Sequence, residues 1–290
     1  MSLFLLSIAD AQTSTASPTP PTALCSSWGQ HHYKSFDGRV FTYNGKCSYA
    51  LAVDCRPGFD DFAVHIENDP LCSGSAKCKR SVAIYVNEDV IRLSGSQVAM
   101  GDKIASLPLT RERIEISRIA EYTVVKLWLG EVTVKYDGQS GVYIHAQDKF
   151  KNNTCGICGN FNGDVKDDFM LPGDAGVTQS VNDFGNSWAR PKRGQHCEKV
   201  SDKPKQLCRN ASAMVKGLAT MMCSDLKYRS KFSKCHSKVD PDPFYDMCMA
   251  DVCGSEGDMS GACDILQEYS RQCIRHNVQM DWRNGTNCRK

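Results

Sequence analysis

Residues 122–145 read YTVVKLWLGEVTVKYDGQSGVYIH, and this stretch decides the fold class of the first part of the chain. It begins with β-branched and aromatic residues, and apolar and polar residues then alternate over 132–136, which is the two-residue period of a strand. Gly130-Glu131 and Asp137-Gly138 supply turns, and 142–144 resumes the strand pattern. Closely spaced strands with tight turns predict antiparallel pairing in a β-sandwich.

The β pattern extends outward from this stretch, from Cys25 to about Cys197, and no long helical period interrupts it. Beyond Cys197 a polar stretch at 201–205 breaks the pattern. Apolar residues then recur at three- and four-residue spacing, which predicts an amphipathic helix carrying Leu207, Ala211, Met214, Leu218 and Met221. Asp242-Pro243 resembles the N-cap and first residue of a second helix. The sequence therefore predicts an α+β chain, with an antiparallel β-sandwich followed by a small disulfide-stapled helical domain.

Sixteen cysteines are many for a protein of a reducing compartment, where thiols stay free. They divide evenly at about Cys197, eight on each side, so that each half can close its own bridges. Zinc binding is the alternative for a cysteine-rich chain. Only one CxxC pair occurs, Cys155 and Cys158, without a second pair or a His pair at zinc-finger spacing. We therefore expect disulfides.

The beginning of the chain indicates export. An apolar run precedes Ala9-Asp10-Ala11, which resembles a signal-peptidase site, so residues 1–11 are expected to be a short signal peptide. Residues 12–24 are rich in Pro, Ser and Thr and are expected to form a linker. No segment is long and apolar enough to span a bilayer. We therefore expect a secreted protein without a membrane span.

Charge and motifs exclude several classes of function. The formal net charge is +2, and Lys and Arg are spread along the chain, so we expect no nucleic-acid partner. No GxSxG, HExxH, Walker or GxGxxG motif occurs, so no catalytic residue is predicted. Three Asn-X-Ser/Thr sequons are candidate glycosylation sites in a secreted chain: Asn152, Asn210 and Asn284.

Three motifs of the β half resemble the von Willebrand factor type D domain, in the order that the family has them. They are the opening WGQHHYKSFDG at 28–38 with FTYNGKCSYAL at 41–51, the core CGICGNFNG at 155–163, and the closing FGNSW at 184–188. The helical half resembles the eight-cysteine domain that follows the type D domain in mucins, von Willebrand factor and zonadhesin-like proteins. FYDMCMADVC at 244–253 and the tail from Cys263 to Cys288 carry this match. The resemblance implies a type D domain over 25–200 and an eight-cysteine domain over 202–290.

The Asx-rich loop after the CxxC pair is a candidate calcium site. Hard cations take several oxygen ligands, and Asn and Asp side chains in a tight loop bring oxygens together. A solvated Asx-rich turn is the alternative, and the spacing is not that of an EF-hand. The resemblance implies a structural Ca²⁺ ion. The implied side-chain ligands are Asp37, Asn160, Asn162, Asp167 and Asp168, with Asp164 binding through its main-chain carbonyl.

The resemblance also implies the disulfides of the β half, which are Cys25–Cys158, Cys55–Cys155, Cys47–Cys197 and Cys72–Cys78. A redox role for the CxxC pair is the alternative. That role requires a strand-to-helix setting, whereas a Gly/Asn loop follows the pair here. Pairing in the helical half stays open, because eight cysteines allow many connectivities.

The segment Gly29–His32 departs from the Gly-Asp-Pro-His sequence of many mucin-type members, some of which cleave themselves at the Asp-Pro bond. Neither the Asp nor the Pro is present here, so we expect no such cleavage. His31 and His32 could bind a metal, but paired surface imidazoles are more often solvated. We expect solvated imidazoles.

The resemblance implies a secreted, non-catalytic adhesive or matrix or mucus-type structural protein that binds extracellular proteins or glycoproteins. Two other classes stay open. Luciferases of certain ostracod crustaceans also contain type D domains, but they are longer and have two of them. Soluble regulators that bind growth factors or lipid-carrying proteins usually add Cys-rich repeats or a lipid-binding region, and neither is seen here. The even cysteine count permits full internal pairing, so we expect a monomer, with covalent oligomers as the alternative. We expect the chain to be one truncated or minimal assembly of these two domains.

Overall fold

The computed structural model describes residues 22–29, 31–58, 61–68, 79–173, 175–192, 194, 196–201, 208–284, 286 and 288, and the structural account concerns these residues. The expected signal peptide lies outside them, and so do Cys72 and Cys78. The expected linker over 12–24 ends earlier than its composition suggests. Residues 22–24 already pair, as part of the first strand, with residues 145–147.

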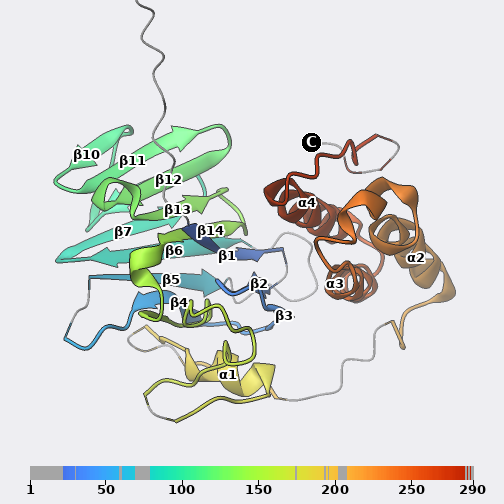
Figure 1. The fold of residues 1–290 in the computed structure, drawn as a ribbon, viewed down its shortest axis with the longest axis horizontal. Helices are drawn as coiled ribbons and strands as arrows, with labels where there is room; N and C mark the ends of the chain where they lie inside the picture. The colour runs from blue at the N-terminus through green and yellow to red at the C-terminus, as the bar shows by residue number, and fades with distance from the viewer. Residues whose placement is uncertain are drawn as a thin grey trace, which may run out of the picture.

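A two-layer antiparallel β-sandwich forms the first part of the chain, as predicted (Figure 1). One sheet has the strand order β10-β11-β12-β13-β14-β1-β2-β3, and the other has the order β15-β4-β5-β6-β7-β8-β9. The strands are β1 (Thr22–Trp28), β2 (His32–Lys34), β3 (Val40–Thr42), β4 (Ser48–Asp54), β5 (Phe62–Asn68), β6 (Arg80–Val86), β7 (Asp89–Ser94), β8 (Gln97–Met100), β9 (Lys103–Ile104), β10 (Leu109–Arg111), β11 (Ile114–Ile119), β12 (Tyr122–Leu127), β13 (Val132–Tyr136), β14 (Val142–Gln147) and β15 (Thr154–Cys155).

Side-chain alternation explains how these strands form two sheets around one core. β5 and β13 each bury every second residue, which is the pattern of a strand with one face against a partner sheet. The turn expected at Asp137-Gly138 is present between β13 and β14. Asp137 Oδ1 accepts hydrogen bonds there from the main-chain amides of Gln139 at 2.8 Å and Gly141 at 2.9 Å.

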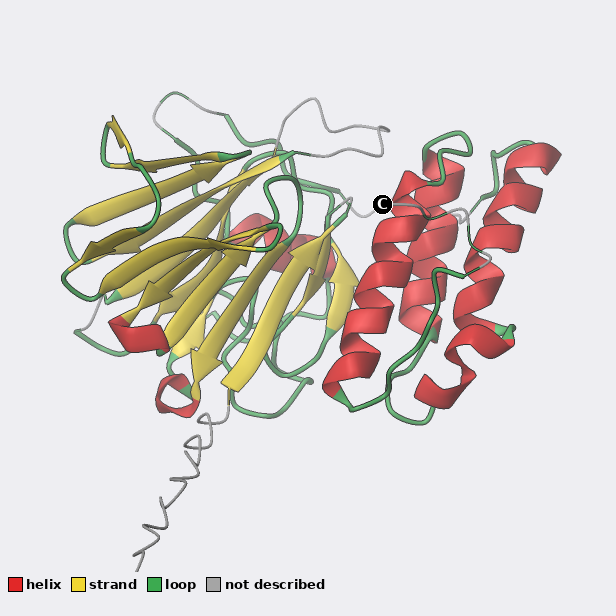
Figure 2. Cartoon of the chain, turned by 90° about the horizontal axis from the view of Figure 1, so that it is seen from above, coloured by secondary structure: helices red, strands yellow, loops and turns green. Residues whose placement is uncertain are grey.

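The helices stand beside the sandwich as a separate layer (Figure 2). They are α2 (Ala213–Lys227), α3 (Asp242–Gly254) and α4 (Ser260–Arg275), with the 3₁₀ turn η3 (Ser230–Cys235) between α2 and α3. Two other 3₁₀ turns, η1 (Trp128–Gly130) and η2 (Asp148–Phe150), belong to the sandwich half. A further short helix, α1 (Val181–Ser187), lies within the sandwich half and was not predicted. The Ser180 side chain caps it by accepting a hydrogen bond from the Asp183 amide at 3.1 Å.

Two helix starts differ from the sequence prediction. α2 begins at Ala213 rather than near Leu207, because the Ser212 hydroxyl accepts a hydrogen bond from the helix and caps it there. Leu207 itself lies outside the described residues. Asp242 is the first residue of α3 rather than its cap, and its carboxylate pairs with Lys227 at 2.8 Å.

Two hydrophobic cores hold the structure together. The larger core fills the space between the two sheets. The smaller core lies among α2, α3, α4 and η3, yet it also contains Trp28 from β1. The sandwich therefore contributes a side chain to the core of the helical domain.

Candidate functional site

The Asx-rich loop follows β15 and lies against the turn between β2 and β3. Asp37 in that turn accepts hydrogen bonds from the main-chain amides of Asn162 at 3.0 Å and Gly163 at 2.8 Å. Within the loop, the Asn162 side chain donates to Asp167 at 2.7 Å and accepts from the Asp164 amide at 2.7 Å. The structure thus brings together residues that the resemblance implies to be ligands, although Asp37 and Asn162 are 125 residues apart in sequence.

Three side-chain oxygens of this loop are buried without a hydrogen-bond partner: Asn160 Oδ1, Asp167 Oδ1 and Asp168 Oδ1. Asp168 is 1% exposed, and burial followed by the nearby carboxylates of Asp37 and Asp167 raises its pKa to about 7, although Ser35 donates to it at 2.7 Å. Buried oxygens without donors cost free energy unless an ion or a water satisfies them. These oxygens therefore fit a bound cation.

Gly159 is required for this arrangement. A Cβ atom at this position would lie 2.1 Å from Asp168 Oδ1, and its φ of +79° is in the left-handed region. Only glycine combines this backbone conformation with so close an approach of a carboxylate. The glycine after Cys158 thus places the carboxylate of Asp168 against the loop.

The chemistry of the loop limits the kind of ion that fits. Among the described residues, no three His, Cys, Asp or Glu side chains lie close enough to hold a metal ion by themselves. An ion would need amide and main-chain oxygens as well, and calcium takes this mixture whereas zinc prefers nitrogen and sulfur. Asp164 already has partners in the loop. Its carboxylate accepts from the Lys166 amide at 3.0 Å, and its carbonyl accepts from the Asp167 amide at 3.4 Å.

Every cysteine in the described part of the chain is in a disulfide. In the sandwich half the bridges are Cys25–Cys158, Cys55–Cys155 and Cys47–Cys197, which are pairs implied by the resemblance. The pair Cys72–Cys78 lies outside the described residues. Both cysteines of the CxxC motif are thus bonded to distant partners, at sequence separations of 133 and 100 residues. This arrangement leaves no free thiol pair for redox exchange at the motif.

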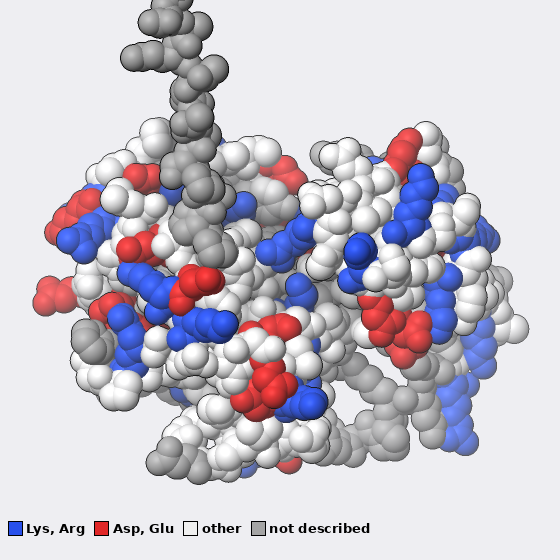
Figure 3. Space-filling model, viewed as in Figure 1, with Lys and Arg blue, Asp and Glu red and all other residues white. Residues whose placement is uncertain are grey.

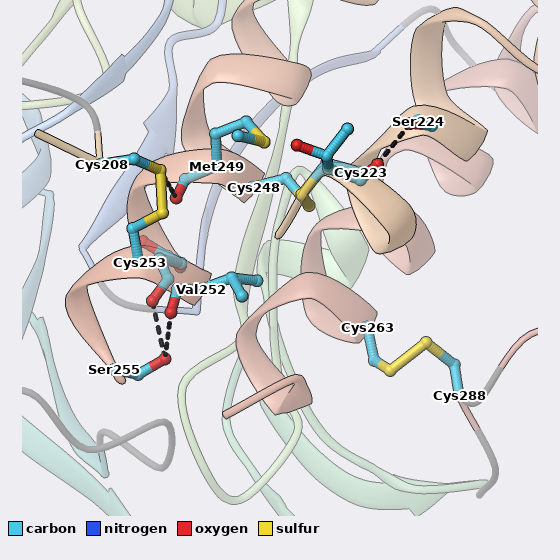
Figure 4. The surroundings of a disulfide bond; sticks show 12 residues. Cys208, Cys223, Ser224, Cys248, Met249, Val252, Cys253, Ser255, Cys263 and Cys288 are labelled. Atoms are coloured by element: carbon cyan, nitrogen blue, oxygen red, sulfur yellow. Dashed lines mark hydrogen bonds between the residues drawn. A yellow bond between two sulfur atoms is a disulfide. The ribbon is translucent and has the colours of Figure 1, made fainter. Parts of the chain in front are cut away.

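The helical domain closes its own bridges. They are Cys208–Cys253, Cys223–Cys248, Cys235–Cys273 and Cys263–Cys288, and Figure 4 shows the first, second and fourth of them. No bridge between described cysteines crosses from one half to the other, as predicted from their even division. The contact between the two domains is therefore non-covalent apart from the chain itself.

The junction between the domains is built around the β1–β2 turn. Trp28 is 2% exposed and stacks on Phe244 of α3, with ring centroids 6.1 Å apart and planes 16° apart. His32 is fully buried, and its Nε2 lies 2.9 Å from Asp251 Oδ2 of α3. His31 is 4% exposed. The prediction of solvated imidazoles is wrong for both residues, since both are buried, and α3 reaches His32 through Asp251.

A buried carboxylate fixes α4 against the sandwich. Glu268 of α4 is 0% exposed and accepts hydrogen bonds from Ser26 of β1 at 3.5 Å, Tyr143 of β14 at 3.1 Å and Gln272 at 2.6 Å. Burial raises its pKa, and Arg271, 3.6 Å away, opposes the rise. A shift of α4 would break the hydrogen bonds from Ser26 and Tyr143 and leave these buried polar groups short of partners, which is unfavourable, although Arg271 on the same helix would move with Glu268. Nothing in the sequence pattern distinguished this glutamate from the other polar residues of the helix.

The three glycosylation candidates lie at the surface. Asn152, Asn210 and Asn284 are all exposed. Thr154, the third residue of the first sequon, is 3% exposed and donates to the Gly159 carbonyl at 3.0 Å. Each asparagine is thus accessible in the folded protein.

Comparison with known proteins matches each half of the chain to a domain family. The family model of the von Willebrand factor type D domain matches residues 25–175, and that of the C8 domain matches residues 222–289. The chain therefore belongs to the von Willebrand factor type D family and carries a C8 domain after the type D domain. The described fold continues past the matched segment, since Cys47 is bonded to Cys197.

Similar proteins are much longer than this chain. The chain is 31% identical over 265 residues to otogelin-like protein of Homo sapiens, covering 90% of this chain and 11% of that protein. It is 32% identical over 274 residues to von Willebrand factor of Bos taurus, covering 91% of this chain and 28% of that protein. It is 31% identical over 274 residues to mucin-5B of Gallus gallus, covering 93% of this chain and 12% of that protein. The chain thus spans a minor part of each relative's length.

These relatives are secreted proteins, and this protein is likewise extracellular. Its disulfides agree with that location, because disulfides persist in oxidising environments. Among the helices that the structure describes, none is both long and apolar enough to cross a membrane.

Proposed function

We propose that this protein is a non-catalytic structural or adhesive module of the extracellular matrix or mucus, stabilised by calcium, that acts by binding extracellular proteins or glycoproteins. The observation that carries the proposal is the junction, where Trp28 enters the core of the helical domain and Glu268 fixes α4 against β1 and β14. Disulfides brace each domain on either side of it. Such a module presents a fixed surface, so binding a partner costs little ordering entropy.

Calcium is proposed to occupy the Asx-rich loop. The buried oxygens of Asn160, Asp167 and Asp168 support this assignment, and Asp37 is held against the same loop. The ion would supply positive charge that offsets the crowded carboxylates and would tie the loop to the β2–β3 turn. Asn162 and the carbonyl of Asp164 complete the proposed ligand set. Its role is structural, because it joins two segments of the sandwich.

The surface is proposed to carry N-glycans at Asn152, Asn210 and Asn284, each of which is exposed. The protein is proposed to be a monomer, since every described cysteine has an internal partner. Electrophoresis of the secreted product with and without reductant tests this proposal. A dimer band that disappears on reduction would contradict it.

Calcium binding is tested by calorimetric titration and by thermal melting of the secreted protein with Ca²⁺ or with EDTA. We expect Ca²⁺ to raise the melting temperature, and Asp168→Asn to abolish both the heat of binding and the rise. Asp102→Asn is the matched control, since Asp102 is an exposed turn residue outside the loop. A wild-type protein that takes up no Ca²⁺ and melts alike in both buffers would refute the proposed metal site.

The non-catalytic role is tested separately with an imidazopyrazinone luciferin, the substrate class of the luciferases that contain type D domains. We expect no luminescence above the buffer rate from the purified protein. Light emission proportional to protein concentration would instead favour the enzyme alternative. A partner is sought by pull-down from extracellular fluid.

A further inference from the structure

A hollow of about 520 Å³ lies beside the Asx-rich loop and is lined by Gly38, Arg39, Val165, Lys166 and Gln179. Its size is within the range of small-ligand sites. Segments far apart in sequence form it: Gly38 and Arg39 come from the β2–β3 turn, and Val165 and Lys166 come from the Asx-rich loop itself, with Gln179 beside them. On the face seen in Figure 3, acidic side chains gather below the position of β3, with basic side chains beside them.

Arg39 is held in one orientation in the wall of this hollow. Its guanidinium carbon lies 3.4 Å from the centroid of the Phe169 ring, and Phe169 in turn stacks on Phe184 at 4.6 Å. One guanidinium nitrogen donates to the Val165 carbonyl at 3.4 Å. Stacking and this bond fix the plane of the group before any ligand arrives. A guanidinium fixed in this way suits two-point binding of a planar or tetrahedral anion.

The second cation, Lys166, is exposed, and its main-chain amide is tied to Asp164 at 3.0 Å. Within the described part of the chain, no ion pair joins Arg39 or Lys166 to an acidic side chain. No carboxylate lines the hollow, although Asp168 is near enough to influence Arg39. The side chains of Arg39 and Lys166 are therefore available to an anionic ligand. They attract it most strongly when a bound metal ion neutralises the carboxylates of the Asx-rich loop.

We infer that this hollow binds an anionic sugar unit, with Arg39 and Lys166 holding its carboxylate or sulfate. The Gln179 amide and the Gly38 backbone are suited to sugar hydroxyls. The lining contains one small apolar side chain, Val165, and no aromatic side chain that would anchor a peptide. The inference rests on the proposed extracellular role for the choice of ligand, since acidic glycans are abundant outside cells.

The test uses the full secreted protein in Ca²⁺, with its own N-glycans removed enzymatically so that they cannot compete. Binding of sialyllactose, sulfated lactose and neutral lactose is measured by NMR titration, together with a short poly-glutamate peptide. We expect at least one anionic sugar to bind about tenfold or more tightly than lactose, as expected for a charge-assisted contact. The stronger of the two anionic sugars identifies carboxylate or sulfate as the group recognised.

Arg39→Met and Lys166→Gln are each expected to weaken binding of the anionic sugar about tenfold. Lys103→Gln is the matched control, because Lys103 is exposed on β9, at the opposite edge of its sheet from β15. If Arg39→Met does not fold, the exposed Lys166→Gln still decides the question. Equal binding of lactose, stronger binding of the peptide, or unchanged affinity in Lys166→Gln would each overturn the inference.

Failure of this inference differs from failure of the proposed metal site. A Ca²⁺-dependent rise in melting temperature without sugar binding rejects the sugar site alone. Absence of that rise rejects the metal site, whatever the sugars do.

Discussion

Replacing Trp28 by alanine is expected to destabilise the helical domain, although Trp28 belongs to β1 of the sandwich. Its indole is 2% exposed and lies in the core formed by α2, α3 and α4, stacked on Phe244. The indole nitrogen has no hydrogen-bond partner, so the substitution removes packing contacts and no hydrogen bond. Deleting a buried tryptophan side chain costs about 3–5 kcal/mol, since a cavity remains.

The assay is denaturant unfolding with the disulfides intact, combined with native-state hydrogen exchange of the amides in α3 and α4. We expect exchange to accelerate in these helices in Trp28→Ala. Trp128→Ala is the matched control, because Trp128 packs on Phe62 and Phe150 of the sandwich, outside the helical core. Exchange in α3 and α4 that stays at the wild-type rate in Trp28→Ala would show that Trp28 does not stabilise the helical core.

Two further predictions concern single residues. Burial, followed by the Asp137 charge, raises the pKa of Asp264 to about 6 against the opposing influence of Arg271, so the native state binds this proton more tightly than the unfolded chain. Asp264 should therefore add to the free energy of unfolding as pH falls from 7 toward 4. Asp264→Asn should be more stable than wild type at neutral pH and show a smaller rise over this range, because Asp168 and Glu268 still contribute to it, as measured by urea unfolding at several pH values. An equal or steeper pH dependence in the variant would contradict this. Gly159→Ala should lower the free energy of unfolding by about 1–3 kcal/mol, because the new Cβ clashes with Asp168. Gly163→Ala is the control: its backbone is also left-handed but nothing lies within 4 Å, so it should lose only the free energy that the strained backbone costs. Equal losses of the two variants in urea unfolding would show that the clash is unimportant.

Much of the sandwich could be predicted from local pattern. The alternation of apolar and polar residues over 132–136 shows directly which side chains face the partner sheet. The turn at Asp137-Gly138 follows from the Asp137 side chain, which accepts a hydrogen bond from the main chain two residues later. Helix starts were less predictable, because Ser212 decides the start of α2 and its capping role is a matter of a single hydrogen bond. The short helix α1 has too few residues to show a period.

The junction could not be predicted, since it depends on contacts between distant segments. His31 and His32 look like a surface pair in sequence, yet both are buried, and His32 is bonded to Asp251 of α3. Glu268 is likewise an ordinary helix residue until β1 and β14 surround it. The loop residues Asn160 to Asp168 could be singled out because their composition is unusual, but the part played by Asp37 rested on family resemblance.

We propose that disulfides within each domain hold it together and leave no thiol chemistry in the mature protein. Mass-spectrometric disulfide mapping of the protein secreted by cells tests it most directly. We expect the four bridges of the helical domain, the three described bridges of the sandwich and Cys72–Cys78, with no alkylatable thiol. Recovery of Cys155 and Cys158 as free thiols, or as a pair bonded to each other, would contradict it.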